Sequence, residues 1–294
     1  MPDSHTHLKS FLNTHPLDAA DSLFDLSDLG VVICSGADAH DFLQNQLSND
    51  LSLMKQHQLS AYCSPKGRIL VLFHVLKLGD EYALIAPQAV LDKTLPRLKM
   101  FIMRASVTLT QSEDIRLIGL HGASIPNEPT LFKHSHDAHR AFALCTENVL
   151  KETPLNSLND WTVFDINQLL PQVFLENHEA LIPQSVNLDI VDGVNFKKGC
   201  YPGQEIIARV KYRGKPKTRM INVQSTVPAD IGTPIFIDSR ESSAGLVISV
   251  AEQNGHYLMN ISVPVTHLHE GNLWLDAEKT KGLVRLALPY EITV

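Results

Sequence analysis

The hydrophobic pattern before Met220 mixes two periods, one typical of buried strands and one typical of amphipathic helices. Short apolar runs predict strands at residues 31–33, 82–85, 107–109 and 115–118. Residues 65–67, Pro-Lys-Gly, are a hairpin signal that predicts flanking strands at residues 58–64 and 68–78. Helical spacing of apolar side chains predicts helices at residues 37–47, 90–98, 157–170 and 203–210. Pro96 is expected to kink or split the second helix, and residues 121–157 are expected to be irregular. This mostly antiparallel order of strands, crossed by helices, favours an α+β fold.

After Met220 the pattern changes to short strands separated by proline, glycine and asparagine. The predicted strands lie at residues 220–223, 234–237, 245–251, 256–263, 273–275 and 283–286. Regular short strands with turn residues between them are typical of a small β-barrel or sandwich. A chain of 294 residues, 44% of them hydrophobic, has room for two or three compact units.

The chain lacks the sequence features of membrane and secreted proteins. It contains no apolar run of about 18 residues. Its polar, histidine-rich start shows no basic region followed by an apolar segment. The cysteines are widely scattered, with no Cys-x-x-Cys pair, at Cys34, Cys63, Cys145 and Cys200. A reduced, cytoplasmic location is therefore expected.

The segment with the most chemical content surrounds Cys200. This thiol lies between the lysine pair Lys197 and Lys198 and the start of a predicted helix at residue 203. Backbone N–H groups at a helix N-terminus and nearby ammonium groups both favour thiolate over thiol. Cys200 is therefore a candidate reactive cysteine. The alternative is a small thiol packed in a glycine-rich loop that leads into the helix, and the residues alone leave both interpretations open.

Charge is concentrated in the same region. The chain has a net charge of −7, yet residues 197–219 carry many basic side chains and the single acid Glu205. The members proposed to form an anion patch are Lys197, Arg209, Lys211 and Arg213. The alternative is a solvated charged face. Three nearby histidines at 134, 136 and 139 lack regular spacing and a companion cysteine, so a loop is expected there and no bound metal.

Residues 198–205, here called the signature loop, resemble the signature of the YgfZ family of folate-binding proteins. The shared residues are Lys198, Gly199, Cys200, Tyr201, Gly203, Gln204 and Glu205. Residues 36–38, 42–50, 65–68, 182–188 and 209–214 are similar as well. This family is a branch of the superfamily that includes the aminomethyltransferase (T-protein) of the glycine cleavage system.

The resemblance implies a fold and a division of the chain. It implies a folate-binding, ferredoxin-like α+β body in two halves at residues 21–212, and the polar, histidine-rich start of the chain predicts a loose leader before it at residues 1–20. A C-terminal β-barrel at residues 213–294 would complete a ring around a central ligand channel.

The resemblance also implies a ligand, tetrahydrofolate or a derivative. Trp161 stands where an aromatic wall of the folate site is expected, although a core tryptophan fits the pattern equally well. Leu29 replaces a tryptophan of family members, and Asn167 stands where the superfamily often has a pterin-binding glutamate. Gln184 and Asn187 belong to the similar segment and are further candidate contacts.

The resemblance implies the function of a folate-binding accessory protein that supports iron–sulfur cluster assembly or repair and acts on tRNA modification indirectly. Its partners would be iron–sulfur client proteins or assembly factors. Aminomethyltransferase activity is not expected, because the aliphatic Val71 and Leu72 replace an Asp-Asp pair. Direct tRNA binding is the alternative, but Tyr201 and Tyr212 are the only aromatic residues interleaved with the basic block.

The resemblance further implies that the hairpin at residues 63–68 faces the same channel as the signature loop. Cys63 could then lie close enough to Cys200 to form a disulfide, which requires Cα atoms within about 7 Å. The alternative is that Cys63 fills an apolar position in its strand, and both remain open.

Overall fold

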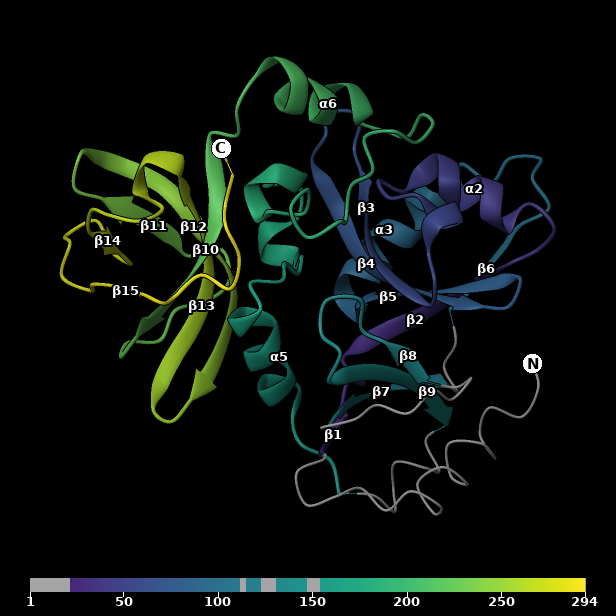
Figure 1. Cartoon of the computed structure of the whole chain (residues 1–294), viewed down its shortest axis with the longest axis horizontal. Helices are drawn as coiled ribbons and strands as arrows, with labels where there is room; N and C mark the ends of the chain where they lie inside the picture. Colours follow the sequence, from purple (N-terminus) through teal and green to yellow (C-terminus); the bar gives the residue numbers. More distant parts are fainter. Residues whose placement is uncertain (1–21, 112–114, 123–130, 147–153, 294) are drawn as a thin grey trace. The chain divides into compact units, whose positions relative to one another are not determined.

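The computed structural model of the chain describes residues 22–111, 115–122, 131–146 and 154–293 (Figure 1). It contains two compact units. The first comprises Met1–Gln44, Asp50–Ser60 and Phe73–Trp161, and the second comprises Asn45–Asn49, Ala61–Leu72 and Thr162–Val294. The expected boundary at residues 212 and 213 stays a prediction, and the expected leader lies outside the described residues.

A five-stranded sheet has the order β3-β4-β5-β2-β6. Its strands are β2 (Leu29–Ser35), β3 (His57–Cys63), β4 (Ile69–Leu78), β5 (Glu81–Pro87) and β6 (Thr108–Gln111). Every residue of β3 and the first eight residues of β4 are buried. Burial on both faces explains the nearly continuous apolar run of β4, whereas β3 also buries the polar His57, Gln58 and Ser60. The helices α2 (Ala39–Gln46) and α3 (Gln88–Lys99) follow β2 and β5 along the chain, and α3 packs against both strands.

The helix α3 corrects one part of an expectation, the split at Pro96. It runs from Gln88 to Lys99 with Pro96 inside it, so the proline does not split the helix. Proline removes a single N–H donor and crowds one carbonyl in the preceding turn. The apolar face, which buries Val90, Leu91, Leu95 and Leu98, holds the helix together on both sides of that defect.

A four-stranded antiparallel sheet corrects another. Its order is β1-β7-β9-β8, formed by β1 (Ser22–Asp25), β7 (Ile115–His121), β8 (Leu131–Lys133) and β9 (Arg140–Thr146). The strands β8 and β9 lie in the segment that was expected to be irregular, and that expectation was wrong. Ala141, Ala143 and Cys145, which share one face of β9, pack in a core with Leu23, Ile118, Leu120 and Leu131.

The C-terminal strands form a six-stranded sheet in the order β14-β11-β12-β13-β10-β15, a small and nearly closed barrel (Figure 1, green to yellow). The strands are β10 (Thr218–Ser225), β11 (Pro234–Ile237), β12 (Arg240–Gln253), β13 (His256–Pro264), β14 (Leu273–Trp274) and β15 (Val284–Arg285). The β12–β13 turn places Asn254 and Gly255 at positive φ, the geometry that favours Asn-Gly in tight hairpins. The predicted α+β class with a C-terminal barrel is confirmed.

Two further helices place the candidate residues. The helix α5 (Leu158–Asn167) begins after Ser157, whose hydroxyl accepts from the Asp160 N–H and thereby caps the helix. The helix α6 (Gln204–Arg213) follows the signature loop. Short 3₁₀ helices lie at Leu51–Leu53, Leu175–Asn177, Pro183–Val186 and Val265–His267. No helix within the described ranges has the length and apolar character to cross a membrane.

Candidate functional site

The four cysteines, all of which the structure describes, differ sharply in access. Cys34, Cys63 and Cys145 are buried, and Cys200 is exposed. Burial raises the pKa of each of the three enclosed thiols to about 12, so they are neutral at pH 7. Since thiolate is the nucleophilic form, Cys200 is the thiol that is placed to react with molecules in solution.

Hydrogen bonds of the Lys198 side chain hold the loop that carries Cys200. This lysine is 8% exposed, and its Nζ donates to the carbonyl oxygens of Leu47 at 2.6 Å and Asn49 at 2.8 Å. The same ammonium lies 5.4 Å from the centre of the Tyr201 ring. Lys198 therefore fixes the backbone of the signature loop, and only Lys197 of the lysine pair is exposed.

A second attachment joins the signature loop to the hairpin between β3 and β4. Gly203 has φ 82°, and a Cβ built on it would lie 2.5 Å from the Ser64 carbonyl oxygen and 2.8 Å from the Gly67 Cα. A Cβ on Gly67 would in turn meet Ile206 of α6 at 3.0 Å. The two backbones approach so closely that only glycine fits, and α6 starts immediately after this contact at Gln204.

Cys63 lies beside this junction without being exposed. Tyr201 is 7% exposed, and its pKa is raised first by burial and second by the nearby Cys63. The Cys63 thiol is thus close to the signature loop but enclosed and neutral, which makes it slow to exchange with disulfides. Pairing between Cys63 and Cys200 stays a prediction.

Two candidate folate contacts in the second unit are bound to the protein itself. Gln184 is buried in the 3₁₀ helix Pro183–Val186, and its Nε2 donates to the Ile207 carbonyl at 2.8 Å. Asn187 is fully buried with φ 57°, and its amide donates to the Met220 carbonyl and accepts from the Met220 N–H. These side chains join α6 and β10 to the 3₁₀ helix. The Gln184 Oε1 is buried and has no hydrogen-bond partner among the described residues, so this acceptor is available to a ligand.

Trp161 is packed into the core of the first unit. It is 2% exposed, with Phe24 and Phe142 each 5.5 Å from its ring centre and the Arg140 guanidinium 4.9 Å away. A folate ring could stack on Trp161 only if one of these three groups moved. Of the other two candidates, Leu29 is buried in β2 and Asn167 is exposed at the end of α5.

The basic block divides into internal and surface residues. Arg219 is 3% exposed and forms a bidentate ion pair with Asp189. Like Lys198, it makes contacts inside the protein and is not part of the surface. Four of the exposed members form, with two aromatic residues, what we call the α6 surface: Lys197, Arg209, Lys211, Arg213, Phe196 and Tyr212. Phe196 is the member that sequence reasoning missed.

The aromatic residues of the α6 surface lie next to its charges. Tyr212 is 67% exposed, and its ring centre lies 6.0 Å from that of Phe196 in an edge-on arrangement. The Lys211 ammonium lies 5.4 Å from the centre of the Phe196 ring. This combination of cations and an open aromatic ring suits an anionic partner that also has flat, stackable groups.

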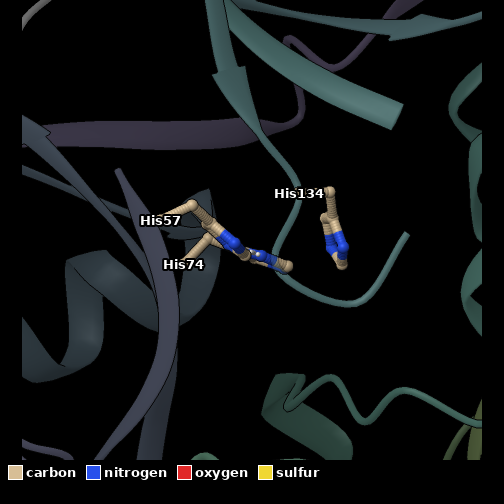
Figure 2. Close-up of side chains that lie close together, drawn as sticks. All are labelled: His57, His74 and His134. Carbon is tan, nitrogen blue, oxygen red and sulfur yellow. Dashed lines mark hydrogen bonds between the residues drawn. The ribbon is translucent and has the colours of Figure 1, made fainter. Parts of the chain in front are cut away.

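Histidines far apart in the sequence also meet. His134 follows β8 in the predicted histidine-rich loop, but its ring packs against His57 of β3 and His74 of β4 (Figure 2). No spacing rule links these three positions, so the cluster could not have been found without the fold.

Comparison with known proteins first defines the class. No protein-family profile matches the chain. The fold is similar to that of the glycine cleavage system aminomethyltransferase T from Bartonella henselae, with a TM-score of 0.72 over 96% of this chain and 88% of that chain. At 17% sequence identity this likeness shows the fold alone. The chain therefore has the aminomethyltransferase type of fold.

A curated relative then defines the family. Over 228 residues the chain is 32% identical to the tRNA-modifying protein YgfZ of Photorhabdus laumondii subsp. laumondii. The match covers 68% of this chain and 69% of that protein. The chain belongs to the YgfZ family, as the signature loop predicted.

Proposed function

We propose that this member of the YgfZ family is a folate-binding accessory protein that supports iron–sulfur cluster assembly or repair through the Cys200 thiol. The observation that carries the proposal is the contrast between one exposed cysteine and three buried ones. The exposed thiol sits on a loop held by the Lys198 ammonium and by the Gly203 backbone contact. A rigid, accessible thiol is suited to meeting a cluster or a thiol on a client protein.

The chemistry of a single thiol limits what the protein can do with a cluster. Iron–sulfur clusters are usually held by four cysteine ligands, so Cys200 would contact a cluster transiently. An effect on tRNA modification would then be indirect, through iron–sulfur enzymes that modify tRNA. The curated relative's name, tRNA-modifying protein, agrees with either a direct or an indirect effect.

Aminomethyl transfer is a poor fit to the body of the fold. Val71 and Leu72, the residues that stand in place of an acidic pair, are both fully buried in β4. Aliphatic side chains can neither accept a proton nor orient an amine. The folate, tetrahydrofolate or a derivative, would accordingly act as a ligand that controls the accessory function.

Calorimetry with tetrahydrofolate and 5-formyl-tetrahydrofolate tests the ligand. Saturable binding of either compound supports the proposal, and the absence of binding up to millimolar folate removes the folate part of it. Gln184, whose Oε1 has no hydrogen-bond partner among the described residues, supplies a site-specific check. Gln184→Glu should change folate affinity if its Oε1 contacts the pterin, because a carboxylate accepts but does not donate.

Alkylation tests the thiol. Cys200 should react with iodoacetamide faster than glutathione does at the same pH, and Cys34, Cys63 and Cys145 should stay unlabelled in the folded protein. In cells that lack the gene, Cys200→Ser should fail to restore the activity of iron–sulfur enzymes, whereas Cys145→Ser, a buried and conservative control, should restore it. Equal rescue by both variants would exclude a role for the Cys200 thiol.

The α6 surface supports direct RNA binding as a second candidate. Its exposed cations would contact phosphates, and Tyr212 offers a stacking face. If RNA binds there, affinity for a tRNA transcript should fall steeply with salt, and Lys211→Gln and Tyr212→Ala should weaken it. Lys93→Gln, which changes an exposed lysine on α3, is the control. Salt-independent or absent binding would favour the indirect route.

A further inference from the structure

Three buried histidines of the first unit bring their rings together. His57 begins β3, His74 lies in β4, and His134 directly follows β8. Each is 4–5% exposed, and one ring nitrogen of each lies within 4.8 Å of the others. Figure 2 shows the His57 and His74 rings side by side and the His134 ring opposite them.

The surroundings keep these rings neutral. The Phe142 ring lies 5.4, 5.0 and 5.6 Å from the centres of His57, His74 and His134. Burial, the largest cause, lowers the pKa of all three histidines, that of His74 to about 3. Neutral imidazole is the form that coordinates a metal ion, and three of them make a common zinc ligand set.

Hydrogen bonds account for part of the cluster. The His57 Nδ1 accepts from the Ser135 N–H at 3.0 Å, so its Nε2 carries the proton and donates to the His74 Nδ1 at 3.0 Å. The His134 Nδ1 accepts a longer bond, 3.3 Å, from the His136 N–H. The His134 Nε2 is buried with no hydrogen-bond partner among the described residues. Packing alone does not explain why a polar nitrogen should be enclosed there.

We propose that His57, His74 and His134 form a binding site for a divalent transition metal ion, of which Zn²⁺ is the best fit. Zinc bound at about 2.0–2.1 Å to three imidazoles in a tetrahedron separates their nitrogens by about 3.3 Å. The His57–His74 pair is at 3.0 Å and the whole set is within 4.8 Å, so the ring nitrogens are already close to the spacing that the ion requires. The fourth position would be open to water or a small anion.

Binding requires a change of tautomer and a movement of one turn. For His57 and His134 to bind through Nε2, each ring must move its proton from Nε2 to Nδ1, with no net gain or loss of protons. The N–H groups of Ser135 and His136 would then have to turn away, and both belong to the turn that carries His134. Metal binding is therefore coupled to the conformation of residues 134–139.

The nearest permanent charges are compatible with the ion. The Arg140 guanidinium is buried near the cluster and opposes a cation, but its Nε is paired with the Asp137 carboxylate at 2.9 Å. The remaining positive field favours an anionic fourth ligand, such as hydroxide, over a neutral one.

Cobalt and zinc titrations of the chelator-treated full chain test the proposal. Wild type should bind one Co²⁺ with the visible absorption of a four-coordinate ion, and Zn²⁺ should displace it. His74→Gln and His134→Gln should each weaken binding at least as much as loss of an outer-shell partner does, about 10–100-fold. His256→Gln, which alters an exposed histidine of β13, should bind as wild type does.

A measurement on wild type protects the test against variants that fail to fold. X-ray absorption of the zinc-loaded chain should count three imidazole ligands. Failure to bind a stoichiometric ion, retention of wild-type affinity in both cluster variants, or a site with fewer imidazoles would each overturn the proposal. The last two outcomes would assign the ion to histidines on the surface.

Discussion

Replacing Gly203 by alanine should destabilise the second unit by more than backbone preference alone can explain. The new Cβ would lie 2.5 Å from the Ser64 carbonyl oxygen and 2.8 Å from the Gly67 Cα. Both atoms are backbone, so no side chain can rotate away to make room. The hairpin between β3 and β4, or the start of α6, would have to shift.

A matched glycine separates the two contributions. Gly203 and Gly255 have similar φ angles, 82° and 75°, but the Cβ position of Gly255 has no atom within 4 Å. A left-handed φ costs an L-residue roughly 1–2 kcal/mol, which is the whole expected effect of Gly255→Ala. Crowding adds about 1–3 kcal/mol, so Gly203→Ala should lower the free energy of unfolding by about 2–5 kcal/mol.

Urea unfolding in a Trp161→Phe background measures this difference. The chain has two tryptophans, and the remaining one, Trp274, lies in the second unit and reports its unfolding. Midpoints compared at constant slope give the loss for each variant. If Gly203→Ala lost no more stability than Gly255→Ala, the close approach of the signature loop to the hairpin would be refuted.

Other variants test the remaining contacts. Lys198→Met should destabilise the second unit by about 2–3 kcal/mol, because two buried carbonyl groups lose a charged hydrogen-bond donor. Its control, Lys197→Met, changes an exposed lysine and should stay within about 0.5 kcal/mol of wild type in the same urea assay. Trp161→Ala should lower the free energy of unfolding by about 3–5 kcal/mol in the absence of folate, because the ring is a core side chain. A loss below about 1 kcal/mol, measured by thermal unfolding, would contradict the assignment of Trp161 to the core. Burial lowers the pKa of His74 to about 3 in the folded protein. At a pH below the ordinary pKa of histidine, His74 therefore takes up a proton on unfolding, and stability that is present at pH 7.5 is lost as the pH falls. Between pH 7.5 and 5.5 this loss is about 1.4 kcal/mol for His74, and urea unfolding of His74→Gln in the absence of metal should show a correspondingly smaller pH dependence.

Much of the secondary structure could be predicted because local signals agreed with the final packing. Every predicted strand after Met220 has a counterpart among β10–β15, since proline, glycine and asparagine mark the turns between them. The strands β8 and β9 were missed although the apolar run from Ala141 to Cys145 is typical of a buried strand. The charged and histidine-rich residues on either side of that run obscured it.

The candidate site was less predictable because its contacts join distant segments. Lysine is rarely buried, so nothing in the sequence indicated that Lys198 would reach the carbonyls of Leu47 and Asn49. The prediction of a reactive loop treated Lys197 and Lys198 as two equivalent charges beside Cys200. In the structure the Lys198 ammonium instead holds the backbone of the loop, and Lys197 is exposed. His74 stood in a strand that was predicted from the neighbouring hairpin signal, and His57 lay one residue before the other strand of that hairpin.

The signature loop therefore combines residues that hold the backbone with residues left free for chemistry, and Gly199 distinguishes the two roles. A Cβ on Gly199 would meet no atom within 4 Å, and its φ is not positive. Unlike Gly203, Gly199 has no structural need to be glycine. Its small size instead leaves the neighbouring Cys200 accessible to a large partner.

Gly199→Ala tests that argument. Its free energy of unfolding should stay within about 0.5 kcal/mol of wild type, because the added methyl group projects into open space. Alkylation of Cys200 by iodoacetamide should also be unchanged, while labelling by a maleimide attached to a bulky polymer should slow. If both reagents slowed equally, the methyl would be altering the thiol itself and the access argument would fail.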